Sequence, residues 1–175
     1  IGIFMSVFAA ELNGFLRNFL PMSVFEITII VTPITEEILK AAPILVYATV
    51  LAAKKEKLFT ASMAVGIGFA VLENAFYLLN DASFNMIDAL IRAFGAGLMH
   101  GMCTLLVGVG ISFAKKKSKI FVVGTFALLS TAITYHGIYN MLVQSQFEII
   151  GYLLPMATYI PFFVWRIKNL LKKEK

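Results

Sequence analysis

Residues 89–114 read ALIRAFGAGLMHGMCTLLVGVGISFA, a run in which Arg92 is the one charged residue. A helix needs about twenty apolar residues to cross the ~30 Å hydrocarbon layer of a bilayer, and this run is longer than that. A buried helix of a large soluble protein can also be apolar on all sides. The rest of the chain must therefore decide between a soluble core and a membrane.

Similar runs recur along nearly the whole sequence. Hydrophobic residues make up 59% of the chain and charged residues 14%, and the mean hydropathy is +0.85. This composition cannot supply the polar surface of a small soluble domain. We predict an all-α fold, a polytopic transmembrane bundle of about five to seven spanning helices. The five well-defined spans are expected at residues 34–53, 58–79, 89–114, 120–143 and 149–167.

The first 32 residues allow two interpretations. Residues 1–20 are long enough to span, although they contain Glu11 and Arg17, and residues 23–32 are too short to span alone. We expect either a first span followed by an interfacial segment, or a longer second helix kinked near Pro33, because proline disrupts a helix interior.

The basic residues indicate orientation and not a nucleic-acid partner. The net charge is +5, but the connections at 80–88 and 144–148 carry no Lys or Arg. This alternation follows the positive-inside rule, so we predict a multi-pass cell-membrane protein with cytoplasmic Lys-rich loops and a cytoplasmic C-terminus. The basic clusters are Lys54, Lys55 and Lys57; Lys115, Lys116, Lys117 and Lys119; and Arg166, Lys168, Lys172, Lys173 and Lys175.

Ionisable residues inside the expected spans are the strongest functional signal. An uncompensated charge at the bilayer centre costs at least ~2.5 kcal/mol, so each needs a partner or a function. At 1.5 Å per residue, counting from the nearest cytoplasmic lysine places four of them about 22–26 Å from the inner boundary, in the outer half of the membrane. The four are Glu37, Glu73, His100 and His136.

Helical spacing groups these residues with neighbours three or four positions away, which share a face. Each stripe alone is compatible with charge neutralisation or core packing. Four stripes that meet at one depth favour a functional site, open from outside. The stripes are Glu36 and Glu37 with Lys40; Phe69, Glu73 and Tyr77; Arg92, Ala96 and His100; and His136 with Asn140.

Carboxylates beside imidazoles suit the activation of water for attack on a carbonyl, as in peptide hydrolysis. The developing oxyanion would need donors, which His136 and Asn140 offer one turn apart. The chain has no HExxH, GxSG or GxGD motif, and the single cysteine, Cys103, excludes a disulfide framework and a cysteine-rich zinc module. A Cys103 nucleophile is disfavoured.

Four motifs in order carry a family resemblance: EEILK at 36–40, FAVLE at 69–73 followed by Asn74, His100, and HGIYN at 136–140. They resemble the PrsW family of intramembrane proteases, within the wider group of CAAX-processing and bacteriocin-immunity membrane proteases. The resemblance implies a single protease domain over residues 1–175, with catalytic helices at 34–143, a last span at 149–167 and a basic tail at 168–175.

The resemblance also implies roles for the residues. Glu36 would be the base for water, with Glu37 beside it and Lys40 paired to both. Glu73 and His100 would complete the water site, and His136 and Asn140 would face the oxyanion. The supporting residues are Phe69, Asn74, Lys40 and Arg92. Arg92 is either a gate or carboxylate partner on the His100 face or, as we favour, an anchor at the outer interface.

Two features separate this chain from the CAAX-type enzymes, which have EExxxR and FxxxH where this chain has EExxK and Glu73. A prenylated substrate is therefore disfavoured, and a CAAX-type prenyl-protein peptidase is an alternative only. The resemblance allows metal-free or metal-dependent chemistry. Metal-free chemistry is favoured; if a metal such as zinc is present, its ligands are expected to be Glu36, Glu73, His100 and His136.

We therefore predict an intramembrane endopeptidase that acts on a membrane-anchored protein near the extracytoplasmic side. The PrsW branch implies an anti-sigma factor as one such substrate, and other tethered proteins are equally allowed. The expected partners are the lipid bilayer and this substrate, with no nucleic acid. The alternatives are a proton-coupled transporter or channel, for which we find no internal repeat, and a catalytically inactive scaffold.

Overall fold

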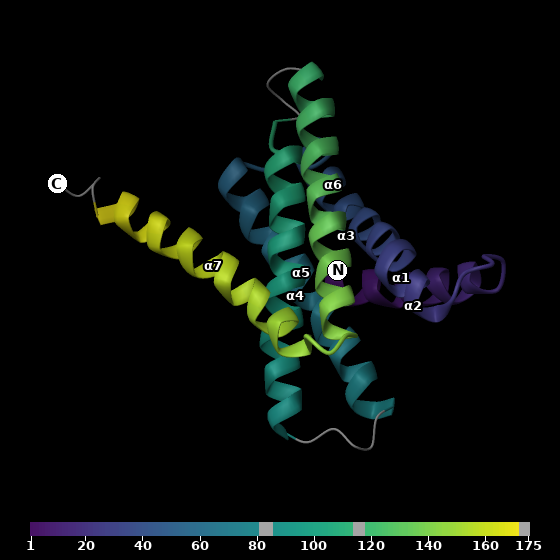
Figure 1. Ribbon diagram of the computed structural model, residues 1–175. Helices are drawn as coiled ribbons and strands as arrows, with labels where there is room; N and C mark the ends of the chain where they lie inside the picture. Colours follow the sequence, from purple (N-terminus) through teal and green to yellow (C-terminus); the bar gives the residue numbers. More distant parts are fainter. Residues whose placement is uncertain (81–85, 114–117, 172–175) are drawn as a thin grey trace.

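The computed structural model describes residues 1–80, 86–113 and 118–171, and these residues are helical almost throughout, with no strand among them (Figure 1). The all-α prediction is confirmed. The helices are α1 (Gly2–Arg17), α2 (Val24–Glu26), α3 (Thr32–Thr49), α4 (Lys55–Asn80), α5 (Met86–Ile111), α6 (Ser118–Val143) and α7 (Glu148–Leu171), and a π-helical turn, Ile27–Val31, joins α2 to α3.

Within the described residues, three helices are long and apolar enough to cross a membrane: α4, residues 89–111 of α5 and residues 121–143 of α6. Each coincides with an expected span to within a few residues. The helix α3 has only 18 residues, and three of them are Glu36, Glu37 and Lys40. Length and composition alone therefore do not identify α3 as a membrane span. Its three charged side chains are nevertheless buried inside the protein, away from lipid.

The helix α5 lies at the centre of the bundle. Of its most apolar stretch, 61% is buried inside the protein, against 28% for α4 and 11% for α6. It packs against α3, α4, α6 and α7, while α1 lies against α3 and α4. In Figure 1, α5 and α6 stand upright, α4 runs at a slant to them, and α7 leans away. Side chains on α5 can therefore meet side chains from every neighbouring helix.

Helix is continuous from Val24 to Thr49, which corresponds to the long-helix alternative for this region. The π turn ends two residues before Pro33, where a regular helix would lose a backbone donor. Ser23 caps the beginning, since its hydroxyl accepts from the Glu26 amide and the Glu26 side chain accepts from the Ser23 amide.

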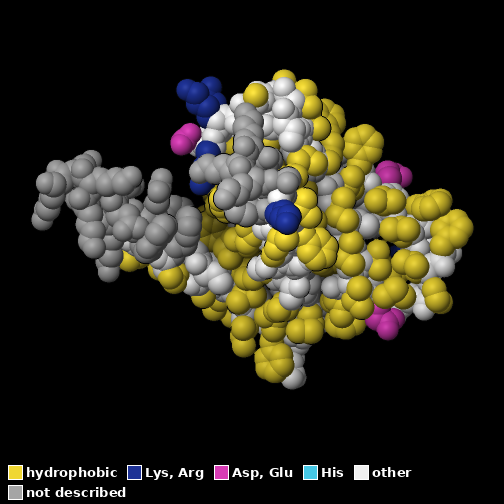
Figure 2. Space-filling model, turned by 90° about the horizontal axis from the view of Figure 1, so that it is seen from above, with side chains coloured by type: hydrophobic (Ala, Val, Ile, Leu, Met, Phe, Trp, Pro, Cys, Tyr) yellow, Lys and Arg dark blue, Asp and Glu magenta, His cyan; other side chains and the backbone are white. Residues whose placement is uncertain are grey.

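The surface is largely apolar. Figure 2 shows one face, seen from above, on which hydrophobic side chains predominate and the few charged side chains are scattered. Large hydrophobic residues such as Phe4, Phe76, Phe94 and Phe126 are exposed on several helices. Lipid, and not water, is the solvent that such a surface fits. Of the three basic clusters, residues 115–117 and 172–175 lie outside the described residues.

Candidate active site

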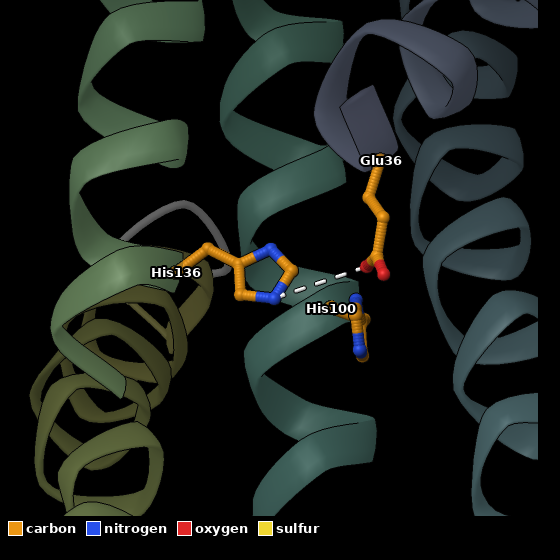
Figure 3. Close-up of side chains that lie close together, drawn as sticks. All are labelled: Glu36, His100 and His136. Atoms are coloured by element: carbon orange, nitrogen blue, oxygen red, sulfur yellow. Dashed lines mark ion pairs between the residues drawn. The ribbon is translucent and has the colours of Figure 1, made fainter. Parts of the chain in front are cut away.

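Three buried side chains from three helices converge in the bundle: Glu36 from α3, His100 from α5 and His136 from α6 (Figure 3). One potential ligand atom from each lies within 4.8 Å of those from the other two. The His136 Nε2 and Glu36 Oε2 atoms are 3.8 Å apart. Three of the helices that carry the predicted stripes thus bring their side chains together, while the depth of the centre in the membrane stays a prediction.

The buried Lys40 ammonium joins residues around this centre. The Lys40 Nζ donates to Glu37 Oε1 at 2.6 Å and to His100 Nδ1 at 2.8 Å, and both Lys40 and Glu37 are 0% exposed. The three-residue spacing on α3 places this carboxylate and ammonium on one face. Because an ammonium has no acceptor, His100 must accept through Nδ1, and its Nε2–H donates to Glu73 Oε2 at 2.6 Å.

Glu73 is held from both sides. Its Oε2 accepts from His100, and its Oε1 lies 3.6 Å from an Arg92 guanidinium nitrogen. The Arg92 guanidinium lies over the Tyr77 ring, 3.4 Å from its centroid. Arg92 is only 8% exposed. It is thus a partner of the Glu73 carboxylate, as the other interpretation of Arg92 expected, and the favoured interpretation as an outer-interface anchor stays a prediction.

The tautomer of His136 leaves two acceptors facing each other. A carboxylate can only accept, so the His136 Nδ1–H donates to Glu37 Oε1 at 2.8 Å. In the neutral ring the Nε2 lone pair is then directed toward Glu36 Oε2, which has no hydrogen-bond partner within the described ranges. A buried carboxylate oxygen that faces another acceptor without a partner is unfavourable unless a proton, a water or a cation lies between the two.

This donor set fits a divalent metal. Two imidazoles and one carboxylate form a ligand set of catalytic zinc sites, and the Glu37 carboxylate on His136 Nδ1 is the outer hydrogen bond that orients a ligating histidine. Glu36 Oε2 has no hydrogen-bond partner among the described residues, and the Nε2 of a neutral His136 presents its lone pair on the same side. His100 has both ring nitrogens engaged, so it would have to release Lys40 or Glu73 to bind. Of the four ligands expected from the sequence, Glu73 lies outside the cluster.

A cavity of about 390 Å³ adjoins this centre. It lies toward the end of the bundle where α4 ends and α5 begins, and its walls come from the α2 to α3 helix and from α4, α5, α6 and α7. Glu73, Arg92, His100, Tyr139 and Asn140 line it. Glu73 and His100 line the cavity, whereas Glu36 and His136 are not part of its lining.

Three residues from the sequence motifs take other positions. The Asn140 amide donates to the Thr28 carbonyl at 3.0 Å, so it holds the π turn while lining the cavity. Asn74 faces a different groove, between α4 and α5, and makes no contact with the centre among the described residues. The Phe69 ring packs against Lys40 and His100, with centroid distances of 4.8 and 5.1 Å.

Sequence reasoning missed Tyr139. It is the third residue after His136 and so lies on nearly the same face of α6. The HxxxN motif that joins His136 to Asn140 does not include it. Its hydroxyl is buried, without a hydrogen-bond partner in the part of the chain described. Helical spacing from His136 was the available signal.

The fold and the site together define an integral membrane protein with a buried glutamate and histidine centre of the kind that hydrolytic enzymes use. A family model described as PrsW family intramembrane metalloprotease matches residues 1–166, nearly the whole chain. The chain therefore belongs to this family, and it is a membrane-embedded peptidase. No curated protein and no solved structure matches it.

Proposed function

We propose that this chain hydrolyses a peptide bond of a membrane-tethered protein near the extracytoplasmic side, and that Glu36, His100 and His136 hold a divalent metal ion such as zinc. The observation that carries the proposal is the buried Glu36 Oε2, which has no hydrogen-bond partner among the described residues and lies 3.8 Å from His136 Nε2. The family description as a metalloprotease agrees with it. This proposal replaces the metal-free preference drawn from sequence.

The surrounding residues fix the ligands in place. A bound zinc ion would polarise the scissile carbonyl and make water a stronger nucleophile. Glu37 accepts from His136 Nδ1 and so keeps the Nε2 lone pair directed toward Glu36. Lys40 balances the charge of Glu37, which has no access to solvent. Apolar helices around the centre exclude bulk water.

Glu73 is the carboxylate best placed to move protons. Its side chain is 25% exposed and lines the cavity, whereas Glu36 lies behind the wall. In hydrolysis, the oxygen of water bonds to the carbonyl carbon and Glu73 accepts the proton. Glu73 then returns the proton to the amide nitrogen as the carbon–nitrogen bond breaks. We therefore assign the role of base to Glu73 and the role of ligand to Glu36.

The substrate is a protein with a tether in the same bilayer, because the cavity is enclosed by membrane helices. Counting from the lysine clusters places the centre in the outer half of the membrane, so the cut falls on the extracytoplasmic side. An anti-sigma factor with one span is one protein of this type, by resemblance to the PrsW branch.

Two glutamate variants distinguish the proposed metal ligand, Glu36, from the proposed base, Glu73. Single-span reporters with different extracytoplasmic stems are co-expressed with the wild type, Glu36→Gln or Glu73→Gln, and the purified proteins are assayed for bound metal. Glu36→Gln is expected to lose metal and cleavage together. Glu73→Gln is expected to keep its metal while the cleavage rate falls about 10²- to 10⁴-fold, since it loses the proton acceptor.

Cleavage that persists in both variants would refute the glutamate mechanism. Full metal content in Glu36→Gln would refute the ligand assignment. The control is Glu11→Gln, which changes an exposed carboxylate on α1 and is expected to alter neither measurement.

A further inference from the structure

Two buried hydrogen-bond donors in the cavity have no acceptor. The Arg92 Nε–H and the Tyr139 hydroxyl both belong to residues more than nine-tenths buried, and neither atom has a hydrogen-bond partner among the described residues. Both residues line the cavity beside Glu73. A buried donor left without an acceptor costs about 1–3 kcal/mol, so such atoms call for a ligand.

The Tyr139 hydroxyl lies against the part of α5 that carries Arg92. The Tyr139 hydroxyl is 3.3 Å from the point where a Cβ on Gly95 would stand, and Gly95 follows Arg92 by three residues, on the same face of α5. The absence of a side chain at Gly95 thus leaves the hydroxyl next to the helical turn that carries Arg92. An edge-to-face contact with Tyr152, at 6.4 Å between centroids, holds the Tyr139 ring.

The charges nearby favour a neutral acceptor. Glu73 lies on the cavity wall beside Arg92, and the Arg92 charge is already set against it. A substrate carboxylate at this place would therefore meet the like charge of Glu73. A backbone carbonyl oxygen accepts two hydrogen bonds and carries no charge.

We propose that Arg92 and Tyr139 bind backbone carbonyl oxygens of the substrate peptide and so position it against Glu73. This inference deepens the proposed function, on which it rests, by naming substrate-binding residues of the same site. Asn140 was expected to donate to the substrate, but its amide donates to the Thr28 carbonyl instead. The donors for substrate then come from the residue before Asn140 and from the start of α5.

The test measures peptide binding without cleavage. The full chain carrying Glu36→Gln, in lipid nanodiscs, is titrated with the neutral peptide N-acetyl-pentaalanine amide, and binding is followed by the rise in Tm. Adding Tyr139→Phe or Arg92→Lys is expected to weaken the Kd about 3- to 10-fold, the effect of one hydrogen bond. Tyr139→Phe is also expected to leave the Tm without peptide unchanged or higher, because the hydroxyl it removes has no partner.

Tyr135→Phe is the matched control. It removes a hydroxyl from the same helix, one turn earlier, that is paired with Thr158 at 2.9 Å and lies outside the cavity lining. It is expected to lower the Tm and to leave the peptide Kd within about twofold of the parent.

Three results would overturn the proposal: an unchanged Kd in both variants, no binding at millimolar peptide, or tighter binding of the same peptide with a free carboxylate. Mass spectrometry of the peptide keeps the two proposals apart. If the Glu36→Gln protein still cleaves the peptide, the proposed mechanism has failed, whereas the binding comparison stands on its own.

Discussion

Lys40 is the residue on which the charge balance of the site depends. It is 0% exposed, and its ammonium joins Glu37 to His100. Removal of one partner of a buried ion pair leaves the other charge uncompensated, which lowers the free energy of unfolding by about 3–5 kcal/mol. The role of Lys40 is thus structural as well as electrostatic.

A double-variant cycle tests this role. Lys40→Met is expected to lower the free energy of unfolding by about 3–5 kcal/mol, whereas Lys40→Met with Glu37→Gln is expected to recover much of the loss because the buried negative charge is gone. Denaturant unfolding in detergent micelles measures both. If the double variant is no more stable than the single one, the cost comes from packing around the lysine and not from the unpaired carboxylate.

At the same scale, spacing predicted part of the site and missed part. Helical period alone placed Lys40 beside Glu37, and this ion pair occurs in the structure. It also placed Arg92 on the His100 face, and both of these side chains lie against the Glu73 carboxylate. Spacing within one helix carries no information about partners on another helix. It therefore could not show that Asn140 binds the Thr28 carbonyl, or that Glu73 lies on the cavity wall and Glu36 behind it.

At the scale of elements, the contact between α4 and α5 positions His100. Gly66 on α4 packs against the His100 carbonyl, and a Cβ there would also lie 2.8 Å from the Gly101 Cα. Close approach of these two helices requires a residue without a side chain. By contrast, a Cβ on Gly97 would meet nothing within 4 Å.

Gly66→Ala is therefore expected to destabilise the protein by about 1–3 kcal/mol and to weaken metal binding, because α5 must shift and carry His100 with it. Gly97→Ala is the control, expected to leave the Tm unchanged or higher, since alanine favours helix over glycine. Thermal unfolding and metal titration of the two variants provide the comparison. Equal Tm values would mean that the helices do not meet at Gly66.

Hydropathy predicted the spans well, because lipid contact imposes long apolar runs: the expected 58–79 lies inside α4, and 120–143 inside α6. The π turn at Ile27–Val31 could not be predicted in this way. It arises from Pro33 and from packing against α6, where the Ile29 carbonyl lies 2.7 Å from the position of a Cβ on Gly137. Such tertiary contacts leave no periodic signal.

At the scale of the whole molecule, the lysine clusters predict the orientation in the bilayer. The connection before α4 is basic, and the connection between α6 and α7 contains no basic residue. The positive-inside rule then predicts that the cavity end of the bundle lies outside the cytoplasm. We expect water and a substrate stem to reach Glu73 from that side.

Cysteine labelling in whole cells tests the orientation, in a Cys103→Ala background. Gln146→Cys, at an exposed position between α6 and α7, is expected to react with a membrane-impermeant maleimide. Lys57→Cys, exposed at the start of α4, is expected to react only after the cells are permeabilised. The reverse pattern would place the cavity on the cytoplasmic side and would exclude extracytoplasmic cleavage.

The most direct test of the central claim is metal dependence of the wild-type protein. The purified chain is stripped with a chelator and titrated with zinc while reporter cleavage and bound metal are measured together. We predict that cleavage is lost on stripping and returns as zinc approaches one equivalent per chain. Full cleavage by protein that contains no metal would contradict the assignment of Glu36, His100 and His136 as a metal centre.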